Sequence, residues 1–252
     1  KYLQNDIPFF TDHTIMLQHI NADVVSICTP NHLHVTHTID VLKAGCHAIT
    51  EKPMALSTAD CDLMIDTAKE TQKTIFAVKQ NRYNPPVQAV KELIDSGKLG
   101  KIMMQVNCFW NRSDAYYAQS QWRGSKIMDG GILFTQFSHF VDILYYLNGN
   151  INKAQGLLNN FSHQHNIEFE DTAAFVMEAD NGAIINFNAT ISAFEKNMEG
   201  SITIIAENGT VKIGGQYLNT LEYQCIRDTT LQAINISAHE NDYGLYKGSM
   251  SN

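Results

Sequence analysis

The stretch from Cys28 to Pro53 contains side chains that can do chemistry near a bound ligand. It begins with the run Thr29-Pro30-Asn31-His32-Leu33-His34 and ends with Glu51-Lys52-Pro53. The proline keeps the backbone of Lys52 extended, and a lysine that is partly desolvated beside a cofactor can act as a general base. Spacing alone leaves open the alternative of an ordinary surface lysine.

A second group of polar side chains follows the pair Gly130-Gly131, where a backbone without side chains can approach a ligand closely. Periodicity predicts a helix over residues 132–147, in which Thr135, His139 and Asp142 are spaced i, i+4 and i+7 and form a polar stripe. A histidine on such a stripe can be a general base or can hold the substrate. A helix histidine with only structural hydrogen bonds is the alternative.

Two arginines, Arg112 and Arg123, each follow a residue with a planar side chain, in the pairs Asn111-Arg112 and Trp122-Arg123. A guanidinium binds a carboxylate or phosphate through two parallel hydrogen bonds, although a solvated loop arginine is the commoner case. The ten histidines lack the spacing of known metal-binding motifs, so no metal is expected.

Short apolar runs alternate with helical periodicity in the first third of the chain. Residues 23–28, 47–50 and 74–79 are predicted strands, and the first and third read as buried on both faces. Ser57 with Asp60 predicts the start of a helix, and Gly45 predicts the end of another. A β-α-β-α-β order predicts a parallel sheet, in which the strand ends that carry Thr29 and Glu51 lie on one edge.

The composition changes at residues 80–86, the predicted boundary between a domain at 1–80 and a domain at 81–252. Residues 102–110 alternate as a long half-buried strand, and Asn181-Gly182 and Asn208-Gly209 predict hairpin turns. The expected fold class is therefore α/β. A partial dinucleotide-binding domain would be followed by an α+β domain with a large open, mostly antiparallel sheet.

Bulk composition narrows the function classes. The 252 residues carry a formal net charge of −8, which argues against binding to nucleic acid or anionic membranes. No apolar run reaches the roughly 20 residues that a membrane-spanning helix needs. Five widely spaced cysteines are odd in number and predict free, buried thiols in a reducing cytoplasm.

The run Thr29-Pro30-Asn31-His32-Leu33-His34, followed by Glu51-Lys52-Pro53, resembles the glucose-fructose oxidoreductase/inositol dehydrogenase (Gfo/Idh/MocA) family. The resemblance implies a Rossmann domain and hydride transfer between NAD, with NADP not excluded, and a sugar or polyol carbon. It also implies a homodimer or homotetramer formed through the C-terminal sheet. Implied catalytic residues are Lys52 and His139. The cofactor-binding residues implied are Thr29, Pro30, Asn31, His34, Glu51, Lys52, Pro53, Asn81, Trp122 and Arg123. The substrate-binding residues implied are Lys52, Arg112, Arg123, Thr135, Gln136 and His139.

The stretch from Phe109 to Gly131 is most similar to the nucleotide-sugar branch of that family. The resemblance implies oxidation at C3 of UDP-N-acetylglucosaminuronate, a step toward surface polysaccharides. A dehydrogenase of another sugar or of an inositol is the alternative enzyme. A non-catalytic binding or regulatory protein on the same fold is the alternative class.

Two departures from the family pattern affect these expectations. The Gly-rich phosphate loop and the residue that selects NAD or NADP are absent, so we expect the first part of the Rossmann domain to precede Lys1. Many members have an aspartate four residues before the histidine, where this chain has Thr135. The sequence does not determine the substrate, the direction of reaction, the choice of dinucleotide or the oligomer size.

Overall fold

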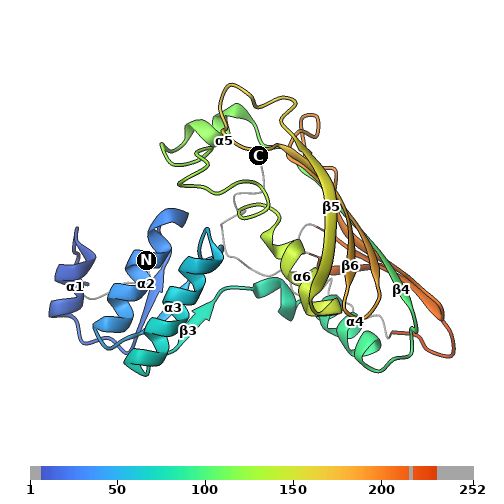
Figure 1. The fold of residues 1–252 in the computed structure, drawn as a ribbon, viewed down its shortest axis with the longest axis horizontal. Helices are drawn as coiled ribbons and strands as arrows, with labels where there is room; N and C mark the ends of the chain where they lie inside the picture. Colours follow the sequence, from blue (N-terminus) through green and yellow to red (C-terminus); the bar gives the residue numbers. More distant parts are fainter. Residues whose placement is uncertain (1–6, 216–217, 232–252) are drawn as a thin grey trace. The chain divides into compact units, whose positions relative to one another are not determined.

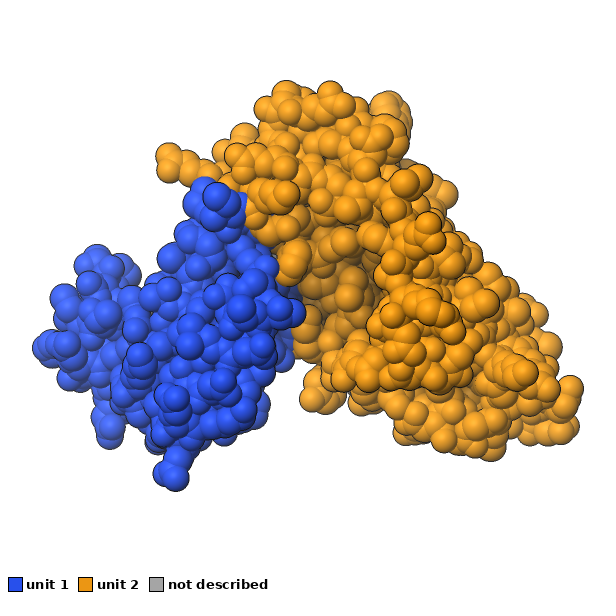
Figure 2. Space-filling model, viewed as in Figure 1, with its two compact units in different colours: residues 1–78, 127–129 blue, residues 79–126, 130–252 orange. Residues whose placement is uncertain are grey.

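The computed structural model describes residues 7–215 and 218–231. The chain forms two compact units (Figure 2). The first unit comprises residues 1–78 together with 127–129, and the second comprises residues 79–126 and 130–252. The short segment 127–129 therefore belongs to the first unit, although it lies far along the chain.

The first unit is a three-stranded parallel sheet with its connecting helices (Figure 1). Its strands are ordered β1-β2-β3, with Val24 opposite His47 and Ala48 opposite Ile75. This order confirms the predicted β-α-β-α-β pattern. The elements are α1 (His13–His19), β1 (Val24–Ile27), the 3₁₀ helix η1 (Asn31–Leu33), α2 (His34–Lys43), β2 (His47–Thr50), α3 (Thr58–Thr71) and β3 (Ile75–Ala77).

Local signals define the helix ends in the first unit. The Ser57 hydroxyl accepts a hydrogen bond from the Asp60 amide at 3.1 Å and caps α3, as predicted. The Asp12 carboxylate caps α1 in the same way, through the Thr14 amide at 2.7 Å. Gly45 has φ +86° just after α2, a conformation that favours glycine.

The prediction that β1 and β3 are buried on both faces is wrong. Val24 of β1 is 45% exposed, and Phe76 of β3 is 55% exposed. In a sheet ordered β1-β2-β3, right-handed crossovers place α2 and α3 on the same face. Within the described residues, the alternate side chains on the other face therefore have no covering layer.

The second unit is built around a seven-stranded sheet ordered β10-β9-β8-β4-β7-β6-β5. Among these strands only β4 and β7 pair in parallel, which confirms the predicted open, mostly antiparallel sheet. The hairpins predicted at Asn181-Gly182 and Asn208-Gly209 join β6 to β7 and β8 to β9. The elements are the 3₁₀ helix η2 (Gln80–Tyr83), α4 (Pro85–Asp95), β4 (Ile102–Phe109), α5 (Asp114–Ala118), α6 (Ser138–Asn148), β5 (Ile151–Asn159), β6 (Thr172–Ala179), β7 (Ile184–Thr190), β8 (Glu199–Ala206), β9 (Gly209–Gly214) and β10 (Thr220–Ile226).

Helices α4 and α6 cover one face of this sheet (Figure 1). Val90 of α4 and Leu144 of α6 join Met104, Val106 and Phe187 of the sheet in the main core, and all five are nearly inaccessible. The predicted alternation of β4 is confirmed, because every second residue of the strand faces this core.

The cysteines agree only in part with the prediction of free, buried thiols. All five are free thiols, as predicted, and Cys46 and Cys108 are buried. Cys28 and Cys225 are exposed, because Cys28 lies just beyond the end of β1 and Cys225 lies on the outermost strand, β10. Within residues 7–215 and 218–231, no helix is long and apolar enough to cross a membrane.

Helix α6 differs from its prediction at its start. It begins at Ser138 instead of residue 132, and Thr135 lies in a preceding turn, where its amide donates to the Gly131 carbonyl at 3.1 Å. The predicted helical stripe is therefore wrong for Thr135. Asp142 is on the helix, but its carboxylate receives two hydrogen bonds from Arg82, at 2.7 and 2.6 Å.

The Arg82–Asp142 pair provides a test of this packing. Replacing Asp142 with Asn removes one charge from a bidentate pair whose carboxylate is nine-tenths buried. We expect the free energy of unfolding to fall by roughly 1–3 kcal/mol in urea denaturation. The control is Asp66→Asn, which breaks an exposed pair with Lys69 and should change stability by less than about 1 kcal/mol. Equal losses of stability in the two variants would contradict the view that the buried Arg82–Asp142 pair stabilises the fold more than the exposed pair does.

Candidate functional site

Two turns meet at the carboxyl edge of the first unit's sheet. The turn after β1 contains Thr29, and the turn after β2 contains Glu51, Lys52 and Pro53. His34, which is 1% exposed, lies between them, with Nδ1 2.7 Å from the Pro53 carbonyl and Nε2 2.8 Å from the Thr29 carbonyl. The imidazole thus ties both turns together and fixes the backbone next to Lys52.

Asn31 also makes its polar contacts within the protein. Its side-chain amide donates to the carbonyl of Asp129 at 2.9 Å and to the Asp129 carboxylate at 3.2 Å, and both residues are buried. Asn31 and His34, both predicted to line a cofactor, thus brace this edge of the sheet. Their contacts hold segment 127–129 and the two turns in place.

The chemistry of this edge fits part of a dinucleotide. Glu51 and Lys52 are half-buried, and the Lys52 amide donates to the Glu51 carboxylate at 3.3 Å. A carboxylate at the end of a parallel strand can accept hydrogen bonds from ribose hydroxyls, and an ammonium group can donate to a substrate oxygen. The remaining predicted cofactor residues, Asn81, Trp122 and Arg123, belong to the second unit.

In the second unit, two arginines converge on one tyrosine, and we call Arg112, Tyr116 and Arg123 the arginine cluster. The guanidinium carbon of Arg112 lies 5.4 Å from the centre of the Tyr116 ring, and that of Arg123 lies 4.5 Å from it. Arg112 also stacks on Trp110 at 5.2 Å. Aromatic rings attract cations in this geometry, so α5, which carries Tyr116, positions both charges.

The Arg112 side chain is unusual because its charge is buried without a carboxylate. The residue is 3% exposed, and no ion pair among the described residues includes it. Its guanidinium donates to the Asn111 carbonyl at 2.6 Å and to the Asn197 side chain at 3.4 Å, while Nε has no partner within the described chain. Burial lowers the pKa of the Arg112 guanidinium from its ordinary value, and Tyr116 partly offsets this.

The predicted substrate residues Thr135 and Gln136 extend the arginine cluster. The Gln136 amide donates to the Tyr116 hydroxyl at 3.3 Å, and the Thr135 hydroxyl contacts the Gln136 side-chain oxygen. Three predicted substrate residues, Arg112, Arg123 and Gln136, therefore contact Tyr116, which the sequence analysis missed, and Thr135 contacts Gln136. The only sequence signal for Tyr116 is its position four residues after Arg112.

Two further residues of interest in the second unit are His139 and Gly131. His139, predicted to be catalytic, lies in the first turn of α6 and is 7% exposed. Gly131, in the turn before this helix, has φ +115°, a conformation that side chains rarely adopt. The pair Gly130-Gly131 therefore forms a tight turn that leads into the start of α6.

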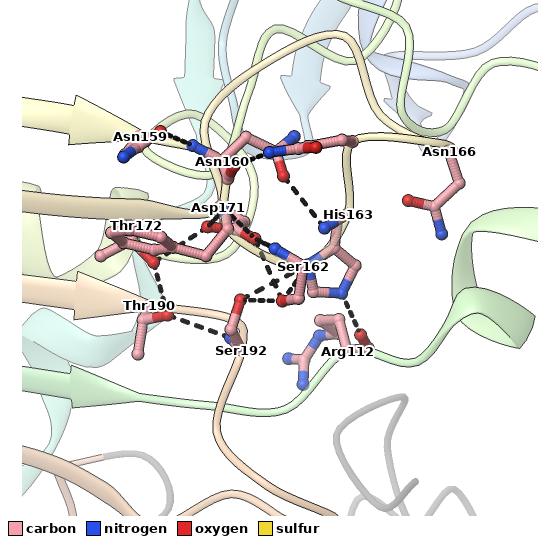
Figure 3. A network of polar contacts seen from close by, with 12 residues as sticks. Arg112, Asn159, Asn160, Ser162, His163, Asn166, Asp171, Thr172, Thr190 and Ser192 are labelled. Carbon is pink, nitrogen blue, oxygen red and sulfur yellow. Dashed lines mark hydrogen bonds and ion pairs between the residues drawn. The ribbon is translucent and has the colours of Figure 1, made fainter.

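A second feature missed by sequence is a buried carboxylate, Asp171, directly before β6 (Figure 3). Asp171 is fully buried and accepts hydrogen bonds from the Phe161 and Ser162 amides, at 3.0 and 2.8 Å, and from the Thr172 hydroxyl at 2.9 Å. His163 Nδ1 lies 3.0 Å from the same carboxylate. Burial by itself raises the pKa of the Asp171 carboxyl, but these hydrogen bonds outweigh it and hold the pKa well below its ordinary value.

Both parts of the chain match known protein families. Residues 3–79 match an oxidoreductase family with an NAD-binding Rossmann fold, and residues 87–212 match the GFO/IDH/MocA C-terminal domain. The second match alone covers half of the chain.

Two solved structures with bound ligands are similar to the chain. The WlbA dehydrogenase from Bordetella pertussis, in complex with NADH and UDP-GlcNAcA, is 36% identical with a TM-score of 0.86. The WlbA dehydrogenase from Chromobacterium violaceum, in complex with the same two molecules, is 36% identical with a TM-score of 0.84. Each match covers 90% of this chain and 66% of the other.

A curated relative is the D-glucoside 3-dehydrogenase of Escherichia coli (strain K12). It is 30% identical over 138 residues, which cover 55% of this chain and 39% of that protein. The chain thus spans at most 66% of the length of these three relatives.

The Asp171 carboxylate provides a pH-dependent test. Its folded-state pKa lies below the unfolded value of 3.8, so its contribution to stability is present above that pH and is lost as the pH falls toward the folded-state pKa. We expect Asp171→Asn to lower the free energy of unfolding at neutral pH by roughly 3–5 kcal/mol, because it leaves His163 with a broken buried pair. The difference from wild type should shrink as the pH falls below about 4 in urea denaturation.

The control for this test is Asp180→Asn, at an exposed position. It should leave the acid part of the stability curve as in the wild type. A difference between Asp171→Asn and wild type that stays constant from neutral to acid pH would contradict the ionised state assigned to Asp171.

Proposed function

This chain belongs to the GFO/IDH/MocA oxidoreductase family, and we propose that the natural protein containing it is an NAD-dependent dehydrogenase of a nucleotide-sugar uronate. The substrate we propose is UDP-N-acetylglucosaminuronate, oxidised at C3 in the cytoplasm on the way to a surface polysaccharide. The likeness to two dehydrogenases solved with UDP-GlcNAcA supports this choice.

The observation that carries the proposal is the buried guanidinium of Arg112. A cation in this environment is stabilised when an anionic group reaches it, and within the described residues no carboxylate pairs with it. A uronate carboxylate matches the guanidinium in charge and in its planar, bidentate geometry. Arg123, on the same tyrosine ring, adds a second positive charge for the substrate.

The protein's own residues divide the chemistry between them. We assign Thr29, Glu51 and the neighbouring backbone to holding the dinucleotide, which when bound supplies the hydride acceptor. Oxidation of a secondary alcohol removes a hydride from carbon and a proton from the hydroxyl, and leaves a ketone. We assign Lys52 as the acceptor of that proton, with His139 as the alternative acceptor. Such a transfer needs donor and acceptor about 3 Å apart, which suits residues on a strand end and a helix.

A second candidate is a dehydrogenase of an uncharged sugar, which the similarity to D-glucoside 3-dehydrogenase favours. The two candidates differ in what Arg112 contacts, because an uncharged sugar gives the guanidinium no carboxylate. NADH absorbance with UDP-N-acetylglucosaminuronate, UDP-N-acetylglucosamine, a glucoside and an inositol separates them. Faster turnover of the glucoside or of the inositol than of the uronate would favour the second candidate.

We also propose that a second copy of the protein covers the sheet face opposite α4 and α6. Strand register places several exposed apolar residues on this face, namely Leu157, Val176, Ile184, Ile205 and Tyr223. Between them lie amides, with Gln105 donating to Asn107 at 2.9 Å. Amides both donate and accept, and the lysines of this face, Lys153 and Lys212, already pair with carboxylates of the same chain, so two copies of the face can meet.

Lys52 is the residue with the sharpest kinetic prediction. We expect Lys52→Met to lower kcat for UDP-N-acetylglucosaminuronate oxidation by roughly 100-fold or more, because the proton acceptor is lost. Lys43→Met, which changes an exposed lysine of α2, should leave kcat unchanged. NADH absorbance in the natural protein provides the measurement. Wild-type kcat in the Lys52 variant would remove the role given to that lysine.

The sheet face also gives a prediction. A double variant, Val176→Lys with Ile184→Lys, places charges in the proposed interface, so we expect dissociation to monomers in analytical ultracentrifugation. Ile15→Lys, at an exposed position of α1, should keep the wild-type mass. An unchanged mass in the double variant, or a monomeric wild type, would refute this interface.

A further inference from the structure

One atom links the polar network around Asp171 to the arginine cluster. His163 Nε2 lies 2.7 Å from the backbone carbonyl of Arg112, while Nδ1 faces Asp171 at 3.0 Å (Figure 3). Both partners are acceptors, so a neutral imidazole with a single N–H can satisfy only one of them. A ring with an N–H on each nitrogen can donate to both acceptors, and the Asp171 carboxylate lies beside it.

The far side of this link is firmly anchored. The Ser162 hydroxyl donates to Ser192 at 2.8 Å, and the Thr172 and Thr190 hydroxyls lie 2.9 Å apart (Figure 3). These contacts connect the loop that carries His163 to β6 and to the end of β7. His163 therefore presents its Nε2 from a frame that is fixed to the sheet.

The near side of the link controls the start of the Arg112 side chain. The Arg112 amide donates to the Ile191 carbonyl at 2.9 Å, and His163 contacts the Arg112 carbonyl. Beyond the backbone, the guanidinium is held by the Trp110 and Tyr116 rings and by hydrogen bonds to Asn111 and Asn197. Two parallel hydrogen bonds to a carboxylate tolerate little displacement, so a shift of this backbone would misalign the guanidinium.

We propose that His163, held by Asp171, is a positioning residue that keeps the Arg112 guanidinium aligned for the carboxylate of the substrate. This inference rests on the proposed function, in which Arg112 binds a uronate. It extends that function to a residue that does not itself contact the substrate. A purely structural role for His163 would lower stability without changing the preference for a carboxylate.

The experiment measures that preference in the natural protein with NADH bound. Isothermal titration gives the dissociation constants for UDP-N-acetylglucosaminuronate and UDP-N-acetylglucosamine, which differ in a carboxylate at C6, and their ratio is the carboxylate preference. Arg112→Gln should lower this preference by roughly tenfold to a hundredfold, the range for a hydrogen bond between charged groups.

Two substitutions of His163 separate its two hydrogen bonds. The Asn amide takes the place of Nδ1, so His163→Asn can donate to Asp171 but loses the Arg112 carbonyl. The Gln amide reaches the place of Nε2, so His163→Gln can still donate to Arg112. We expect His163→Asn to lower the carboxylate preference roughly tenfold and His163→Gln to keep it within about threefold. In an Arg112→Gln background, His163→Asn should have no further effect on the preference.

Asp142→Asn is the control for stability alone, because it breaks the pair with Arg82, which includes neither Arg112 nor a residue of the Asp171 network. It should lower the melting temperature and leave the preference unchanged. If His163→Asn does not fold, His163→Gln decides the question, since a lost preference in a folded Gln variant contradicts the proposal.

The outcomes distinguish this inference from the function on which it rests. If Arg112→Gln lowers the carboxylate preference but His163→Asn leaves it intact, only the role of His163 is overturned. Equal losses in the Asn and Gln variants overturn it as well. If the wild type has no preference for the uronate, both the proposed function and this inference are overturned. The same holds if Arg112→Gln leaves the carboxylate preference unchanged.

Discussion

The site proposed in the second unit depends on one buried positive charge. Arg112 is 3% exposed, and within the described chain it meets carbonyl, amide and aromatic groups but no paired carboxylate. A buried cation is costly unless hydrogen bonds and a negative charge compensate it. Trp110 and Tyr116 supply part of this compensation. The proposed substrate supplies the rest, which couples the stability of the site to the charge of its ligand.

The first unit meets a different requirement, because turns from two strands must be held together at one sheet edge. Parallel strands place these turns side by side, and the Glu51 amide still donates to the Ile27 carbonyl at 3.0 Å, but Thr29 and Pro53 lie beyond this bond. His34 supplies the connection by contacting the carbonyls of Thr29 and Pro53. Lys52 directly precedes Pro53, so the same contact restrains the proposed proton acceptor. In each unit, a buried histidine thus braces the backbone at or beside a residue proposed to act on the substrate.

The features predicted from sequence are those that depend on neighbours in the chain. The hairpin at Asn181-Gly182 and the cap at Ser57 follow from local turn chemistry, and the structure has both. The features that were missed depend on contacts between distant segments. Asp142 pairs with Arg82, sixty positions earlier, and His163 reaches a carbonyl fifty-one positions away. The start of α6 was also misplaced, because apolar periodicity continues through the turn that precedes it.

The most direct measurement is a crystal structure of the natural protein with NADH and UDP-N-acetylglucosaminuronate. The Arg112 guanidinium is expected to donate two hydrogen bonds to the uronate carboxylate, at about 2.8 Å each. His163 should still bridge Asp171 and the Arg112 carbonyl in that complex. A carboxylate bound by other residues, with Arg112 out of hydrogen-bonding distance, would contradict the assignment of this buried cation to the substrate.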